Sequence, residues 1–131
     1  MVIYMRNYFE DGQFNTPRVA TVEPSFNLSG HQNTDRSVTV EVVFKSSSLE
    51  PVFQRGDARP TNGEPHDALF FNAAVNALNM DRHGLTFLAR DNVEDGGTQV
   101  LFQDRTGELW KAQGPTFNDA LATGLEAVSQ E

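Results

Sequence analysis

Cysteine is absent from the 131 residues of this chain. Its absence excludes a disulfide scaffold, a thiol nucleophile and every zinc or iron–sulfur site that needs cysteine ligands. Long apolar runs are missing too, and none approaches the ~20 residues of a membrane span. The first residues lack a basic stretch followed by an apolar one, so we expect no signal peptide, no membrane contact and a cytoplasmic location.

Positive charge is scarce in this sequence. The chain has 10 Lys and Arg against 18 Asp and Glu, which gives a formal net charge of -8. The shortage is greatest over residues 65–131, where 10 acidic side chains accompany 4 basic ones. Proteins that bind nucleic acid cluster Lys and Arg to neutralise phosphates, so we expect no direct nucleic acid binding. The acidic balance instead indicates a protein partner with a basic surface.

Recognisable catalytic motifs are also lacking. Histidine occurs three times and never in an HExxH motif, and no nucleophile elbow, phosphate-binding loop or dinucleotide-binding pattern is present. The pairs His31 with Asp35 and His66 with Asp67 suit acid–base chemistry, but no nucleophile or substrate cradle accompanies them. The sequence therefore predicts a non-enzymatic protein with no catalytic residues, no metal ligands and no cofactor.

The chain does contain enough apolar sequence, 38% of its residues, for one globular domain over residues 1–131. Aromatic and β-branched residues predict a β-meander within residues 1–45, with strands at 2–9, about 17–27 and 36–45. The last of these alternates valine with other residues and is the clearest strand in the chain.

Residues 46–64 are rich in Pro, Gly and Ser, which predicts a long loop. The pattern then changes to that of an αβββα unit over residues 65–131. Its expected elements are a helix at 66–81 that stops at Gly84, strands at 85–90, 98–103 and 108–112, and a closing helix capped by Thr116 with Asp119 in its first turn. We expect an α+β fold with antiparallel sheets and two helices, in the order βββ-loop-αβββα. Both helices should lie on one face of the second sheet, which the meander extends or caps, and we find no internal sequence repeat.

The run ELWKAQGPTFNDALATGLEAV, from Glu108 to Val128, joins a Trp-containing strand, a short turn, a Thr cap and a helix rich in Ala and Leu. In this it is similar to the closing half of small phage-encoded αβββα proteins, the phage ABA-sandwich domains. The double-stranded-RNA-binding domain shares the element order but contacts RNA through lysines at the start of its last helix, and residues 115–119 contain none. The resemblance implies a phage or mobile-element accessory protein. Small acidic members of that class include inhibitors of host defence complexes, such as anti-CRISPR proteins.

Two hairpin turns in the second half of the chain concentrate acidic residues. We predict that these turns meet at one end of the sheet and form the partner-binding site, with the residues Asp91, Glu94, Asp95, Asp104 and Glu108. A calcium loop that starts at Asp91 would have Val93 at its third position and Phe102 at its twelfth, and neither supplies an oxygen ligand from its side chain, so we interpret residues 91–97 as an acidic hairpin. The alternative hypothesis is a phage virion or assembly protein that self-associates through an exposed sheet edge, for which 36–45 is the most β-prone segment.

Two further features allow more than one interpretation. Asn72, Asn76 and Asn79 recur at helical spacing, either as a solvated stripe or as a neutral hydrogen-bonding surface for a partner. The tripeptide Arg55-Gly56-Asp57 spells an adhesion motif, which we interpret as chance because we expect no secretory route.

Overall fold

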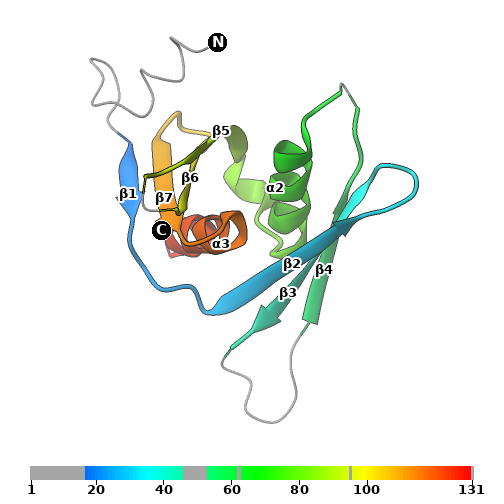
Figure 1. Cartoon of the computed structure of the whole chain (residues 1–131), viewed down its shortest axis with the longest axis horizontal. Helices are drawn as coiled ribbons and strands as arrows, with labels where there is room; N and C mark the ends of the chain where they lie inside the picture. Colours follow the sequence, from blue (N-terminus) through cyan, green and yellow to red (C-terminus); the bar gives the residue numbers. More distant parts are fainter. Residues whose placement is uncertain (1–16, 46–52, 62, 95, 131) are drawn as a thin grey trace.

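The computed structural model describes residues 17–45, 53–61, 63–94 and 96–130 (Figure 1). In chain order the elements are β1 (Arg18–Ala20), β2 (Phe26–Gln32), β3 (Val38–Phe44), β4 (Phe53–Ala58), α2 (His66–Ala77), a 3-10 turn (Asp81–His83), β5 (Thr86–Asn92), β6 (Thr98–Gln103), β7 (Leu109–Gly114) and α3 (Phe117–Ser129). The strands form a four-stranded sheet in the order β1-β7-β6-β5 and a three-stranded sheet in the order β2-β3-β4. These sheets and helices confirm the α+β class. The predicted strand at 2–9 lies outside the described residues.

The order of elements repeats along the chain. The first unit, β2-β3-β4-α2 (residues 26–77), and the second unit, β5-β6-β7-α3 (residues 86–129), are each an antiparallel meander followed by a helix. β1 joins the second unit by pairing with β7 in parallel. A βββα arrangement therefore occurs twice, although the two sequences show no repeat.

The two helices share the space between the sheets (Figure 1). α3 packs on β7 and β6, whereas α2 packs mainly on β4 and β3 and also contacts β5. We expected both helices on one face of the second sheet, and both do contact one face of it, at Phe87, Arg90 and Phe102. The expectation missed that α2 packs mainly on β3 and β4, because β2, β3 and β4 form a sheet of their own with an apolar face to cover. The Phe71 ring joins the two units, since its centre lies 5.4 Å from that of Phe102 and 5.6 Å from that of Phe87. Neither helix in the described part of the chain has the length and apolarity that crossing a bilayer requires.

Alternating valines give β3 its central place in the first sheet. Val38, Val40 and Val42 are fully buried, and β3 pairs with β2 on one side and with β4 on the other. This corrects the expectation that residues 36–45 offer an exposed edge, because the backbone of this strand is already paired on both sides. The hypothesis of self-association through a sheet edge stays a prediction, and among the described residues the edge strands of this sheet are β2 and β4.

β4 lies inside residues 46–64, the stretch that we predicted to be a long loop. Its sequence has a low β propensity, but the strand pairs along its whole length with β3, and such tertiary pairing overrides local preferences. Gly56 makes the packing possible, because a Cβ there would lie 2.3 Å from both the carbonyl oxygen of Ala73 and the amide nitrogen of Ala77 in α2. Residues 46–52 lie outside the described part of the chain.

The helix ends follow the sequence signals in part. α2 ends earlier than predicted, because Asn79 adopts the left-handed conformation with φ 57°. Gly84 takes φ 60° after the 3-10 turn and stops the helical segment as expected. Thr116 caps α3, since its hydroxyl oxygen accepts the backbone N–H of Asp119 at 3.2 Å. The cap that we predicted from the sequence is therefore confirmed.

Candidate functional site

Three hairpin turns share one backbone geometry, and each of them contains acidic residues. They span residues 33–37 between β2 and β3, 93–97 between β5 and β6, and 104–108 between β6 and β7. In each, the N–H of the first residue donates to the carbonyl of the fifth, at 2.8, 3.0 and 3.0 Å respectively. The fourth residue has a positive φ in every case, and these residues are Arg36, Gly96 and Gly107.

These turns separate the acidic residues that we expected to meet. β6 leaves the 93–97 turn and enters the 104–108 turn, so the two turns lie at opposite ends of β6. The expected single cluster is wrong, because successive turns of a meander alternate between the two ends of the strand that they share. The structure instead gives two pairs, with Asp91 and Glu94 at one end and Asp104 and Glu108 at the other. Asp95 lies outside the described residues.

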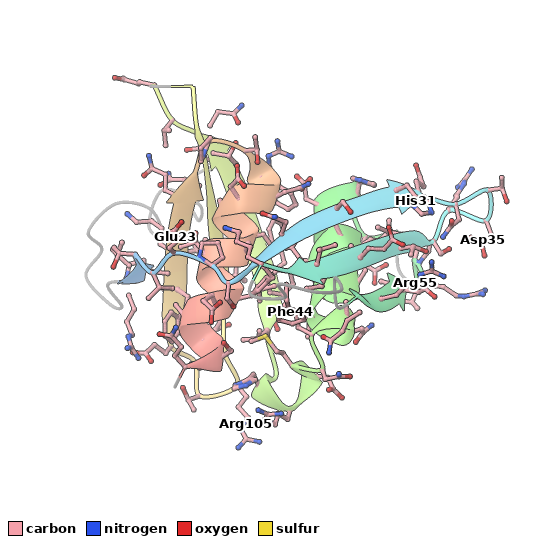
Figure 2. All side chains as sticks on the ribbon, turned by 90° about the horizontal axis from the view of Figure 1, so that it is seen from below. Glu23, His31, Asp35, Phe44, Arg55 and Arg105 are labelled. Atoms are coloured by element: carbon pink, nitrogen blue, oxygen red, sulfur yellow. The ribbon has the colours of Figure 1, made fainter. Side chains whose placement is uncertain are left out.

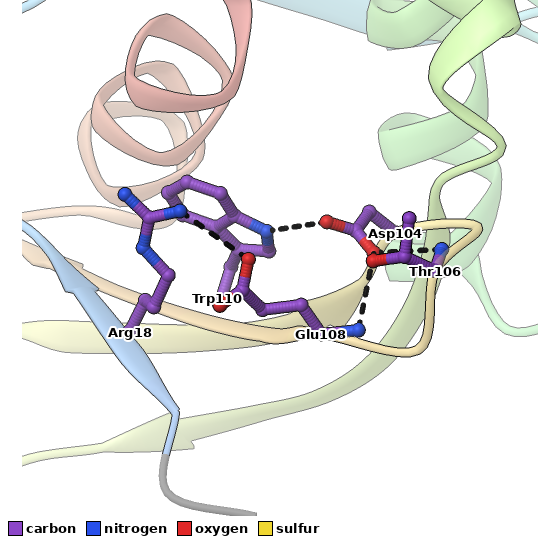
Figure 3. A network of polar contacts seen from close by, with 5 residues as sticks. All are labelled: Arg18, Asp104, Thr106, Glu108 and Trp110. Carbon is purple, nitrogen blue, oxygen red and sulfur yellow. Dashed lines mark hydrogen bonds and ion pairs between the residues drawn. The ribbon is translucent and has the colours of Figure 1, made fainter. Parts of the chain in front are cut away.

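The carboxylate of Asp104 holds its own turn together (Figure 3). Its Oδ1 accepts the backbone N–H of Thr106 at 2.9 Å, the hydroxyl of Thr106 at 2.6 Å and the backbone N–H of Glu108 at 3.1 Å, while its Oδ2 accepts the indole N–H of Trp110 at 3.1 Å. Burial raises the pKa of this carboxyl, but the hydrogen bonds outweigh that effect and hold the pKa below its usual value. This side chain is therefore occupied within the fold.

Cations accompany the acidic residues at the same end. Arg18 lies 3.3 Å from the Glu108 carboxylate, and its guanidinium sits 4.3 Å from the centre of the Trp110 ring. Exposed Arg105 belongs to this turn and donates its backbone N–H to the carbonyl of His83 at 3.1 Å. The 104–108 turn therefore carries charges of both signs.

The opposite end of the second sheet is acidic. Asp91 and Glu94 are exposed. Asp119, in the first turn of α3, lies close to Gly114, which pairs with Thr98 at this same end of the sheet, and a Cβ on Gly114 would approach the Asp119 Cβ to 3.0 Å. Arg90 is nearby but occupied, since it lies 3.0 Å from the Asp67 carboxylate and its guanidinium is 4.7 Å from the centre of the Phe117 ring. We call Asp91, Glu94 and Asp119 the acidic end. Among the described residues, these three carboxylates have no cationic partner.

A shallow groove of about 470 Å³ adjoins the acidic end. Its lining is small and contains three glycines, and it consists of Val93, Gly96, Gly97, Gln113, Gly114 and Pro115. The glycine backbones touch one another, because a Cβ on Gly97 would lie 2.8 Å from the carbonyl oxygen of Gly114. The floor of the groove is therefore backbone that a partner's side chain can approach closely.

The aspartates of the two histidine–aspartate pairs have other partners. His31 is exposed near the tip of the β2–β3 hairpin (Figure 2), and Asp35 accepts the backbone N–H of Ser37 at 3.0 Å and its hydroxyl at 2.6 Å. These hydrogen bonds hold the pKa of Asp35 below its usual value. The Asp67 carboxylate is taken by Arg90, as described above. In the described ranges, no three His, Asp or Glu side chains gather as metal ligands.

One member of the asparagine row, Asn76, and a further asparagine, Asn118, bond to opposite edges of the first sheet. The Asn76 amide donates to the carbonyl of Asp57 at 2.9 Å on the outer edge of β4. On the other edge of the same sheet, the Asn118 amide of α3 donates to the carbonyl of Leu28 in β2 at 3.2 Å. Asn79 instead ends α2, so the row expected from the sequence is not one uniform surface.

Sequence reasoning assigned Asp119 a capping role and did not place it near the 93–97 turn. The missing signal was spatial, because only the packing of α3 against the end of β7 brings it beside the 93–97 turn. Comparison with family models, curated proteins and solved structures finds no match to this chain.

Proposed function

We propose that this protein is a non-enzymatic binding module that docks its acidic end on a basic surface of a protein partner. The observation that carries the proposal is that the exposed carboxylates Asp91, Glu94 and Asp119 all lie toward one end of the second sheet, where Arg90 is already engaged by Asp67 and Phe117. The net charge of -8 supports it, because a strongly negative protein is steered toward a positive surface over several ångströms.

The partner that we propose is a nucleic-acid-handling complex of a host cell. Such complexes hold phosphate backbones in basic channels, and an end rich in carboxylates offers the same sign of charge. The similarity to small phage αβββα proteins points the same way, toward an inhibitor of the anti-CRISPR kind. The glycine groove beside the carboxylates would let the partner approach the backbone, which adds buried contact to the charge attraction.

A double charge reversal tests this proposal. Asp91→Lys with Glu94→Lys should abolish binding of the partner, while the matched control Glu23→Lys with Asp81→Lys makes the same charge change at exposed sites elsewhere and should retain it. Tagged proteins would be used for capture from a host lysate, with washes at about 50 mM and about 500 mM salt to vary screening. We expect a stoichiometric partner that the unchanged protein and the control both retain at low salt.

Two results would contradict the proposal. Retention of the same partner by the Asp91→Lys/Glu94→Lys variant would show that the acidic end is not the contact. Equal loss in the control would show that net charge, and not this surface, holds the partner. Thermal unfolding of both variants by circular dichroism checks that the substitutions leave the fold intact.

A further inference from the structure

β4 is an edge strand, and its outer backbone is open. The Asp57 carbonyl accepts the amide of Asn76 from α2, so it points away from β3. Because backbone direction alternates along a strand, Phe53, Arg55 and Asp57 all present N–H and C=O groups to the outer edge. Within the described residues, no backbone group of another strand bonds to them.

The sequence of this edge is complementary to itself. In an antiparallel pair of two β4 strands centred on Gly56, Arg55 of one copy would stand opposite Asp57 of the other, and the same contact would recur across the two-fold axis. Both residues direct their backbone groups outward, so they would form the hydrogen-bonded pairs of the ladder. Opposite charges on directly facing residues stabilise such pairs. The outward backbone hydrogen-bonding groups and the side-chain charges therefore both favour the register in which Arg55 of one copy faces Asp57 of the other.

The present partners of these side chains leave them available. Arg55 lies 3.3 Å from the Glu41 carboxylate, but its side chain is 68% exposed, and ion pairs of this kind contribute little. Arg55 lies near the hairpin tip that carries His31 (Figure 2). The Asp57 carboxylate accepts the hydroxyl of Thr39 at 2.7 Å, which fixes it on the outer face of the sheet. The Asp57 carbonyl has two lone pairs and accepts a second donor beside Asn76.

The asparagines of α2 fit the same interface. Asn72 and Asn76 are one helical turn apart, and Asn76 already reaches the edge of β4. Two copies related by a two-fold axis through Gly56 would bring these amides toward each other below the joined strands. Amide groups both donate and accept hydrogen bonds, so the row is neutral and matches its own copy.

We propose that a second copy of this chain binds along β4, antiparallel and centred on Gly56, to give a two-fold dimer with a continuous six-stranded sheet. One strand edge and one helix turn bury less than a standard interface of about 1,600 Å², so we expect weak dimerisation with Kd on the order of 100 µM. The acidic end takes no part in this contact, so the dimer stands or falls independently of the proposed function.

Charge exchange across the axis tests the register. Arg55→Glu alone and Asp57→Arg alone would each face like charges in a homodimer, so each should remain monomeric. An equal mixture of the two variants, and the double variant that carries both changes, restore opposite charges at every contact and should dimerise. Sedimentation equilibrium from about 10 µM to about 1 mM spans the expected Kd. The weight-average mass of the unchanged protein should approach twice that of the monomer, and Arg105→Glu serves as a control with unchanged dimerisation.

Three outcomes would overturn this proposal. They are a monomeric mass for the unchanged protein at every concentration, dimers of either single variant, and failure of both the mixture and the double variant to restore dimers. If a variant does not fold, amide hydrogen exchange on the unchanged protein decides. The N–H groups of Arg55 and Asp57 should exchange more slowly at about 1 mM than at about 10 µM, and equal rates would contradict the dimer.

Discussion

The first and second units have the same order of elements, yet they meet the same packing demand in opposite ways. In the first unit the close helix–sheet contact depends on a glycine in the strand, Gly56, against the backbone of α2. In the second it depends on a glycine in the helix, Gly124, where a Cβ would lie 2.7 Å from the Phe102 ring and 3.2 Å from the Ala112 side chain. The close packing of helix on sheet therefore requires a glycine in each unit, and this glycine lies in the strand in one unit and in the helix in the other.

The edges of the two sheets also differ. In the second unit the outer edge of β7 is paired with β1, with Val19 opposite Lys111 in parallel register. In the first unit the matching edge, that of β4, carries the Asn76 amide and otherwise has no strand beside it among the described residues. A similar βββα frame thus has one closed outer edge and one open outer edge, and the open one carries the self-complementary sequence Arg55-Gly56-Asp57.

The largest expected effect on stability comes from the glycines at the two helix–sheet contacts. Gly56→Ala places a Cβ against backbone atoms of α2 that cannot move separately, so we expect a loss of about 3 kcal/mol in the free energy of unfolding. Gly124→Ala meets the Phe102 side chain, which is able to shift, and the helix gains about 1 kcal/mol in propensity, so the net loss should be about 1 kcal/mol. Urea unfolding of both variants measures the difference. Equal losses would show that the two contacts are equally tight.

The next effect compares the aspartates of two turns. Asp104→Ala removes the acceptor of the buried Trp110 indole and of two backbone N–H groups, so we expect a loss of about 2 kcal/mol. Asp35→Ala removes the acceptor of the Ser37 N–H and hydroxyl and an exposed ion pair with Arg59, and should cost clearly less. Thermal and urea unfolding compare the two, and a larger loss for Asp35→Ala would contradict this assignment.

Three carboxyl groups, those of Asp35, Asp104 and Glu126, should make the protein less stable at low pH. The pKa values of Asp35 and Asp104 are lowered from 3.8, mainly by hydrogen bonds that the ionised carboxyls accept. That of Glu126 is lowered from 4.5, because the bonds from Ser25 outweigh the opposing effect of burial. Their contributions are complete above these ordinary values and are lost as the pH falls through the lower folded-state values. We expect the Tm of the protein to decrease as the pH is lowered below about 4.5, and the Tm of Asp104→Asn to decrease less steeply over the same pH range.

The smallest effect concerns the one turn in which an arginine occupies the left-handed position. Arg36 has φ 71°, where the two turns of the second unit have Gly96 and Gly107. Arg36→Gly should raise the free energy of unfolding by about 1 kcal/mol because it removes this strain, and Arg36→Asn should give part of the gain. Gly107→Ala should lower it by a similar amount. A rise in Tm measures the gain. Destabilisation by Arg36→Gly would show that the arginine side chain makes a contact that stabilises the fold by more than the backbone strain destabilises it.

Much of the fold could be predicted from local pattern. The alternating valines predicted β3, the turn residues predicted the 104–108 hairpin, and Thr116 with Asp119 predicted the start of α3, all of which the structure confirms. The strand β4 was missed because its sequence has little β propensity and its stability comes from pairing with β3. The placement of the acidic residues was predicted only in part, since Asp91 and Glu94 lie at one end of β6 while Asp104 and Glu108 lie at the other and are engaged by their own turn and by Arg18.

The sequence by itself determined where the chain turns, which faces are apolar and that the surface is acidic, because these depend on neighbours a few residues apart. Only the tertiary structure decided which strands pair, which helix covers which sheet and which carboxylates share an end of the molecule. Those choices depend on contacts between residues far apart in the chain, such as Gly56 with Ala73 or Gly124 with Phe102. Packing permits such contacts only at particular distances, and no local pattern in the chain encodes them.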